Sequence, residues 1–159
     1  MEIRRATIDD YPALMALEAE VQEVHVEGAP EIFSPGGVTS AESYATLFST
    51  PNQSVMLGID NREAVAYLHY ELLEIPASEF TYAQRTLHIH ALSVKATQRR
   101  KGYGEVMLAY ALETAEKLQL SRVTLDVWSF NQGAYKFYER MGFEPTRIRM
   151  THPLNRALK

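Results

Sequence analysis

The sequence predicts a mixed α/β fold in which a mostly antiparallel central sheet carries helices on both faces. Three observations support this prediction. Short apolar runs rich in β-branched residues recur along the chain and are typical of strands. Residues 54–59, 64–73 and 86–94 form three such runs in close succession, which suits antiparallel pairing. Residues 104–118 have a helical period and separate two strands, which favours a parallel pair joined by a crossover.

Length and composition limit the kinds of protein that this chain can be. It has 159 residues, of which 46% are hydrophobic and 23% charged, so we expect one globular domain over residues 1–159. Sixteen basic and twenty acidic residues give a net charge of −4, which argues against nucleic acid as the partner. The absence of cysteine excludes disulfides and a cysteine nucleophile. No signal peptide or membrane-spanning run is evident, so we expect a cytoplasmic protein without a membrane partner.

The amino-terminal part is predicted to contain one strand and one long helix. Residues 2–6 are the strand, and Asp9 or Asp10 can cap the helix that follows as far as about His25. Prolines and glycines in residues 27–39 then predict a loop.

The next segment leads into the sheet. A serine-capped helix is predicted over residues 40–49, and the polar turn 60–62 joins the strands 54–59 and 64–73. Residues 52–54 match a glycosylation sequon, which we interpret as a chance match in a protein that is not secreted.

In the carboxyl-terminal half, residues 75–80 form a connection before the central strand. The elements predicted there are strand 86–94, helix 104–118, strand 122–128, a helix from Asn131 to Met141, and strand 143–150. Gly142 can stop the last helix. The final strand would lie at a sheet edge, where pairing between two copies would give a homodimer.

The passage from the central strand to the next helix has the features of an anion site. A strand, a basic turn ending in Gly102 and Gly104, and a helix N-terminus follow one another. Unpaired amides at a helix start carry partial positive charge, and glycine lets the backbone approach a ligand closely. Four cations lie in this turn without an intervening acid: Lys95, Arg99, Arg100 and Lys101. We therefore predict a phosphate site.

The spacing of the glycines distinguishes among the known phosphate-binding motifs. A Rossmann fingerprint needs a third glycine where Met107 stands, and no P-loop sequence is present. Residues 99–104 instead spell Arg-x-x-Gly-x-Gly, which resembles the acetyl-CoA signature of the GNAT N-acetyltransferases. The resemblance implies that the amides of this loop bind the coenzyme pyrophosphate.

A second motif strengthens this resemblance. Residues 131–143 spell Asn-x-x-Ala-x-x-Phe-Tyr-Glu-x-x-Gly-Phe, and the predicted order of elements is also that of the family. The resemblance implies that Tyr138 protonates the departing thiolate and that Asn131 contacts the coenzyme. The helical spacing of Ala134, Phe137 and Tyr138 is equally typical of a tyrosine packed in the core, and Asn131 could simply cap its helix.

In this family the central strand and its successor splay apart, and the pantetheine arm pairs with the exposed backbone. The implied co-substrate is acetyl-CoA. The coenzyme-binding residues that the resemblance implies are Leu92, Ser93, Val94, Arg99, Arg100, Lys101, Gly102, Tyr103, Gly104, Asn131 and Ala134.

His88 and His90 are the candidate proton acceptors. Two residues apart on a strand, they would lie on one face about 6.6 Å from each other, with Leu87, Ile89 and Ala91 on the opposite face. An alkylammonium must lose a proton before it can attack a thioester, and imidazole is suited to accept that proton. The run His-Ile-His-Ala-Leu-Ser-Val resembles the corresponding strand of the serotonin (arylalkylamine) N-acetyltransferases, which implies that His88, His90 and Tyr138 form the catalytic set.

Other roles for these side chains remain open. The histidines could be merely hydrogen-bonded strand residues, or bind a metal together with His69, although no acidic cluster accompanies them and we expect no metal. A single histidine could also act, with Glu71 or another acid as the base. Glu27, Phe33 and Asp126 could shape the acceptor site.

The sequence therefore predicts an acetyl-CoA-dependent N-acetyltransferase that acts on a primary amine by direct attack in a ternary complex. A small acceptor, such as an arylalkylamine or a polyamine, is favoured over a peptide amino terminus or an aminoglycoside. A non-catalytic acyl-CoA sensor is the alternative from another class.

Overall fold

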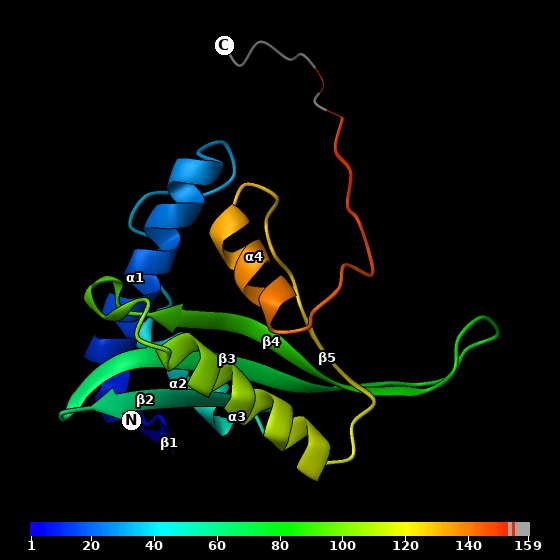
Figure 1. The fold of residues 1–159 in the computed structure, drawn as a ribbon, viewed down its shortest axis with the longest axis horizontal. Helices are drawn as coiled ribbons and strands as arrows, with labels where there is room; N and C mark the ends of the chain where they lie inside the picture. Colours follow the sequence, from blue (N-terminus) through cyan, green and yellow to red (C-terminus); the bar gives the residue numbers. More distant parts are fainter. Residues whose placement is uncertain (153, 155–159) are drawn as a thin grey trace.

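The structure is a computed structural model that describes residues 1–152 and 154. Its centre is a five-stranded sheet whose strands follow chain order (Figure 1). The strands are β1 (Glu2–Arg5), β2 (Gln53–Asp60), β3 (Glu63–Ile75), β4 (Gln84–Val94) and β5 (Arg122–Leu125). All neighbours are antiparallel except β4 and β5, which are parallel. The predicted mixed sheet is confirmed.

Helices cover both faces of this sheet. In the described residues they are α1 (Tyr11–Gly28), α2 (Ala41–Ser49), α3 (Tyr103–Lys117) and α4 (Gln132–Arg140). Leu14 and Leu17 of α1 and Tyr44 of α2 pack on one face, against Val55 and Leu57 of β2. On the other face a larger core joins α3 to the sheet, and side chains of α4 pack at its margin. Each face thus has its own apolar core.

Local sequence signals account for several element boundaries. The Ser40 side chain caps α2 by accepting a hydrogen bond from the Ser43 N–H at 3.1 Å, as predicted. Asn61 and Arg62 have φ of 48° and 66°, the positive values that a tight two-residue hairpin turn between β2 and β3 requires. Gly142, with φ of 85°, follows α4 as predicted.

The pairing between β4 and β5 covers only part of β4. It runs from Thr86 opposite Arg122 to Ile89 opposite Leu125, where β5 ends, whereas β4 continues to Val94. Residues 90–94 therefore have a partner strand on the β3 side only. The splayed strands that the family resemblance implied are present, and the predicted strand 122–128 is shorter than expected for this reason.

A β-bulge lies at the point where the two strands part. The register between β3 and β4 shifts between His69 and Tyr70, so that β4 carries one extra residue there. Leu87 and Ile89 belong to the α3-side core, but Ala91 packs against the α1-side core. The expectation that Ala91 faces the same way as Leu87 and Ile89 is wrong, because the bulge reverses the alternation.

The predicted strand 143–150 is also wrong. This segment follows α4 as an extended chain that leaves the sheet (Figure 1), and no strand is assigned to it. Ile148 and Met150 are 81% and 89% exposed, so the alternating apolar residues have no surface on which to pack. Pro145 also lacks the N–H that a ladder needs. The edge strand on which the homodimer expectation depended is therefore absent.

Candidate active site

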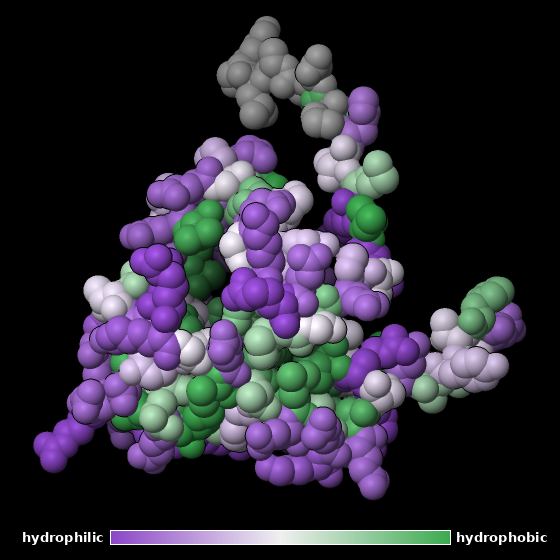
Figure 2. All heavy atoms as spheres, in the orientation of Figure 1, coloured by the Kyte–Doolittle hydropathy of each residue, from purple (hydrophilic) through white to green (hydrophobic). Residues whose placement is uncertain are grey.

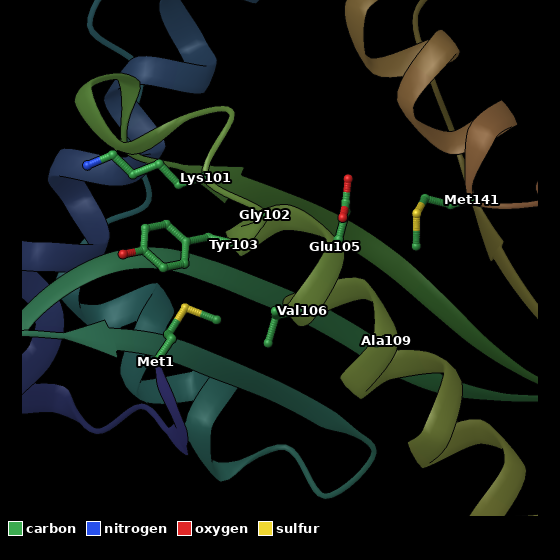
Figure 3. Close-up of a pocket in the computed structure, with 8 residues that line it drawn as sticks. All are labelled: Met1, Lys101, Gly102, Tyr103, Glu105, Val106, Ala109 and Met141. Carbon is green, nitrogen blue, oxygen red and sulfur yellow. The ribbon is translucent and has the colours of Figure 1, made fainter.

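The glycine turn forms an open cradle at the start of α3. Gly102 is the N-cap of α3 in a left-handed conformation with φ of 85°, which suits glycine. By helix geometry the first amides of α3 lack intrahelical partners and point out of its N-terminus. An open groove of about 560 Å³ adjoins them; Figure 3 shows that Gly102, Glu105 and Met141 are among the residues along it. The turn is thus accessible to a ligand.

Two of the four predicted cations are committed to acids. Lys95 pairs with Glu63. Arg99 donates to the Val94 carbonyl at 3.1 Å, and its guanidinium lies 3.5 Å from Glu20 of α1. These contacts fix the turn to the protein rather than to a phosphate.

Arg100 and Lys101 remain as the cations that best suit an anion at this helix start. Both are exposed next to Gly102, and the Lys101 ammonium donates to the Gln98 side chain at 2.7 Å. Tyr103 contributes its backbone, because its hydroxyl donates to Asp60 at 2.7 Å.

The edge of β4 that faces the splayed gap has open backbone groups. The Lys95 N–H donates to the Val65 carbonyl of β3 at 2.8 Å, and an antiparallel ladder alternates its direction with each residue. Ser93 therefore bonds toward β3, and its hydroxyl donates to the Leu17 carbonyl. The N–H and C=O groups of Leu92 and the N–H of Val94 point the other way, into the gap, while the Val94 carbonyl accepts the hydrogen bond from Arg99. The structure thus brings Leu92 and Val94, but not Ser93, to the gap.

Helix α4 lies beside this gap on the α3 side. A Cβ added to Gly104 would lie 3.5 Å from the Phe137 ring and 3.6 Å from Val94, so α4 approaches the cradle closely. Tyr138, the next residue, packs with Phe137 and Phe143, and burial raises its pKa to about 12.

The start of α4 has the capping contact that the sequence left open. The Asn131 side-chain oxygen accepts a hydrogen bond from the Ala134 N–H at 3.1 Å. This contact leaves the Asn131 amide nitrogen available for a ligand.

Three imidazoles form a cluster on the opposite face of the sheet. The ring centroids of His88 and His90 are 4.8 Å apart, and that of His69 on β3 is 4.7 Å from His90. His90 Nε2 is 2.9 Å from Glu71, and His88 Nδ1 is 3.0 Å from Thr124 of β5. Strand alternation places His88 and His90 on the α1 side, as predicted, and the bulge at His90 adds Ala91 to the same side.

His69 lies in the most enclosed part of this cluster. Burial, reinforced by His90, lowers its pKa to about 4, so His69 is neutral at pH 7. Its Nε2 contacts Gln53 at 3.0 Å. In the described part of the chain, no group of three histidine or acidic side chains has an arrangement that could hold a metal.

A second cluster, of aromatic side chains, joins the end of α1 and the loop after it to the segment that follows β5. Phe33 stacks on His25 with a centroid separation of 4.7 Å and meets Trp128 edge to face at 5.2 Å, while Trp128 stacks on Phe130. Trp128 is 43% exposed. The four side chains His25, Phe33, Trp128 and Phe130 are called the aromatic wall below. Figure 2 shows a hollow between α1 and α4.

Not every residue expected at an acceptor site lies there. Glu27 is exposed and stands two positions after His25, about 200° around the helix from the aromatic wall. Phe33 is part of that wall. Tyr44 and Phe48, in contrast, pack in the α1-side core.

Sequence reasoning missed the remaining members of the two clusters. Asn52, Gln53 and Thr124 are polar residues on or next to strands, and nothing in their local pattern separates them from solvated residues. Trp128 and Phe33 lie far apart in the chain, so only the fold brings them together.

Comparison with known proteins agrees with this geometry. Residues 19–143 match the acetyltransferase (GNAT) family. Because that stretch is most of the chain, the protein belongs to this family.

Individual relatives support the same assignment. The uncharacterized N-acetyltransferase YycN of Bacillus subtilis (strain 168) is 30% identical over 77 residues, which cover 48% of this chain and 49% of YycN. The match thus spans about half the length of that curated relative. The crystal structure of a tetramutant of the BH1408 protein of Bacillus halodurans superimposes with a TM-score of 0.93 and 28% identity, covering 97% of this chain and 100% of that one.

A further neighbour shares the fold alone. The aminoglycoside 6'-N-acetyltransferase AAC(6')-IG of Acinetobacter haemolyticus has a TM-score of 0.73 at 14% identity, with 98% of this chain and 99% of that one covered.

Among the described residues, no helix has both the length and the apolar character needed to cross a bilayer.

Proposed function

We propose that this protein is an acetyl-CoA-dependent N-acetyltransferase that acetylates a primary amine by direct attack in a ternary complex. The observation that carries the proposal is the position of the open edge of β4. It lies between the cradle of α3 at one end and the histidine cluster at the other. A coenzyme bound along this edge would bring its reactive end to the imidazoles.

The residues present suit the coenzyme. Acetyl-CoA would supply the acetyl group as a thioester. The first amides of α3, with Arg100 and Lys101, would bind the pyrophosphate. The open backbone groups of Leu92 and Val94 would hold the pantetheine arm by strand-like pairing. Asn131 and Ala134 at the start of α4 would close the other side.

His88 and His90 would accept the proton that the acceptor ammonium must lose. Once neutral, the amine nitrogen forms a bond to the acetyl carbon as the carbon–sulfur bond breaks. The nitrogen then loses its second proton, which replaces, directly or through solvent, the proton given to the leaving sulfur. The first proton passes from the imidazoles to solvent, and Glu71 and Asp126 near them favour approach of a cationic amine. Orientation on one rigid strand would supply much of the rate enhancement, since it can contribute about 7–11 kcal/mol.

Tyr138 would donate a proton or a hydrogen bond to the leaving sulfur. A phenol with a pKa of about 12 gives up its proton to an ordinary thiolate, with a pKa near ~8.5, only at a cost of roughly 5 kcal/mol. The burial that raises the pKa of Tyr138 also raises that of a thiol bound beside it, which reduces this difference. Donation at the transition state is therefore compatible with the raised pKa.

The aromatic wall supports an acceptor that carries an apolar or aromatic body. The charge of Asp126 acts on His88 and partly offsets the lowering of its pKa by burial, so the two residues are close together. In an extended chain Trp128 would lie two residues, or about 6.6 Å, beyond Asp126. A ring joined to an amine by a short chain fits this separation. The resemblance of the histidine strand to the serotonin N-acetyltransferases points to the same class. Polyamines, peptide amino termini and aminoglycosides are the competing acceptors.

Release of free thiol from acetyl-CoA tests the proposal. The purified protein is assayed with four amine classes: arylalkylamines, polyamines, aminoglycosides and peptides with free amino termini. We expect turnover to be fastest with an arylalkylamine. Coenzyme binding without turnover on any amine would instead favour an acyl-CoA sensor.

A further inference from the structure

We infer that Glu71 and Asn52 are positioning residues that select His90, rather than His88, as the group that removes the amine proton. This inference rests on the proposed function and deepens it. It assigns a role to Glu71 on β3 and to Asn52 just before β2. Neither residue needs to contact the coenzyme or the acceptor.

The argument begins with the hydrogen bonds of Glu71. Its side chain is 19% exposed, and each carboxylate oxygen has one partner. Oε2 is 2.9 Å from His90 Nε2, and Oε1 accepts from the Asn52 side-chain amide at 2.9 Å. Asn52 is fixed in turn by the Leu72 carbonyl at 3.3 Å. The carboxylate is therefore held in one orientation against the imidazole.

This contact determines which nitrogen of His90 can act. A carboxylate only accepts hydrogen bonds, so His90 Nε2 must carry the hydrogen that it donates to Glu71. In the neutral ring Nδ1 is then the free base. When Nδ1 takes a proton, Glu71 stabilises the resulting imidazolium by charge. His90 thus has both a defined tautomer and a counter-charge.

His88 has neither of these features. Its Nδ1 contacts the neutral hydroxyl of Thr124 at 3.0 Å. Burial lowers the pKa of His88, which opposes protonation, while the charges of Asp126 and Glu71 offset only part of this effect. His88 meets the His90 ring edge to face, which suits a role in orienting its neighbour.

The other groups around His90 do not compete with Glu71. From β3, His69 packs against the His90 ring and is neutral, since burial lowers its pKa to about 4. From β4 itself the neighbour is His88, and Asp126, just after β5, acts through its charge on that histidine. Glu71 is the ionised group among these that bonds the ring directly.

Consecutive residues at the start of β2 hold the two side chains that flank His90. Asn52 binds Glu71, and Gln53 contacts His69 at 3.0 Å. The sequon of residues 52–54, interpreted above as a chance match, therefore contains two residues that hold the side chains next to His90.

The test compares two glutamate-to-glutamine variants of one strand. Glu71→Gln keeps the shape of the side chain but removes its charge. Glu74→Gln is the matched control, because Glu74 lies on β3 and pairs with Arg85 at the surface, with a side chain that is 78% exposed. We expect Glu71→Gln to lower kcat/KM roughly ten- to a hundredfold and to move the acidic limb of its pH profile to lower pH, with the KM for acetyl-CoA unchanged. Asn52→Ala should change both in the same direction but less.

A second measurement does not depend on turnover. In the protein labelled with ¹⁵N at histidine, the ring shifts of His90 should report a single Nε2–H tautomer at neutral pH, and a mixture of tautomers in Glu71→Ala. If Glu71→Gln matches Glu74→Gln in rate and pH profile, or if the His90 tautomer is the same with and without Glu71, the inference is wrong. If no amine is acetylated by the wild-type protein, the proposed function fails, while the tautomer still tests the Glu71–His90 contact.

Discussion

The two faces of β4 differ in chemistry although they belong to one strand. On the α3 side, Leu87 and Ile89 are buried in an apolar core, and the strand leads into a turn rich in backbone amides and cations. On the α1 side, the same strand carries His88 and His90 among acids and aromatic rings. The bulge near His90 and the early end of β5 separate these surfaces and leave an open edge between them. Under the proposed function, this difference predicts that coenzyme binding and proton transfer can be changed independently.

His90→Ala should have the largest effect, and it should change turnover without changing coenzyme binding. Removing the base should lower kcat/KM by roughly 10²- to 10⁴-fold, the usual contribution of general base catalysis. The affinity for acetyl-CoA should be unchanged, because the cradle lies on the other side of the gap. Steady-state kinetics and calorimetric titration with coenzyme A measure the two quantities. Wild-type kinetics in this variant would remove His90 from the mechanism.

The opposite change, on the coenzyme side, is Gly104→Ala. Alanine favours a helix over glycine by up to about 1 kcal/mol, and its Cβ would make only ordinary contacts with Phe137 and Val94, so Tm should rise slightly. The same methyl group would lie beside Val94, whose backbone N–H would bind the coenzyme under the proposed function, so coenzyme affinity should fall about tenfold. Thermal unfolding and coenzyme titration of one sample check both effects. A variant that is stabilised and binds coenzyme normally would contradict the cradle.

Tyr138→Phe should have an effect of similar size, confined to turnover. The ring packs at the margin of the core in both proteins, so stability and coenzyme affinity should change little. Loss of the hydroxyl should lower kcat by about tenfold. Full turnover in this variant would return Tyr138 to a packing role.

The smallest expected effect concerns pH and stability on the α1 side. The pKa of His69 is about 4 in the folded protein and about 6.5, the ordinary value for histidine, when unfolded. Between these values the unfolded chain binds a proton that the folded protein does not, so stability falls as the pH decreases from 6.5 toward 4. We expect this histidine to account for about 2 kcal/mol of the loss. Urea unfolding of the wild type and of His69→Gln at pH 7.5 and 4.5 should show a weaker pH dependence in the variant. Equal dependence in both would contradict the buried neutral state of His69.

The sequence predicted the α3 side of β4 better than the α1 side. Strands 54–59, 64–73 and 86–94 and the helix after Gly104 were predictable because their periodicity and turn residues are local signals. The cradle is likewise a contiguous run of residues. The shared face of His88 and His90 was predictable from strand alternation, but their contacts with side chains of β3 and β5 were not, because no local pattern specifies which strands are neighbours. For the same reason the meeting of Phe33 with Trp128 was not predicted.

The failure of the predicted strand 143–150 also has a physical explanation. Residues 147–150 alternate between charged and apolar side chains as a strand does, but β5 ends at Leu125 and the segment 143–150 continues away from the sheet (Figure 1). Alternation describes what a segment could bury and does not supply the surface on which it is buried. The early end of β5 therefore explains why residues 143–150 do not form a strand.

The most direct test of the difference between the two faces of β4 is to follow the backbone amide NMR signals while coenzyme A is added. In ¹⁵N-labelled protein, the account predicts the largest shifts at residues 101–105 and at Leu92 and Val94, with little change at His69 or Gln53 on the α1 side. Shifts confined to the aromatic wall, or no saturable shift in the turn before α3, would contradict it.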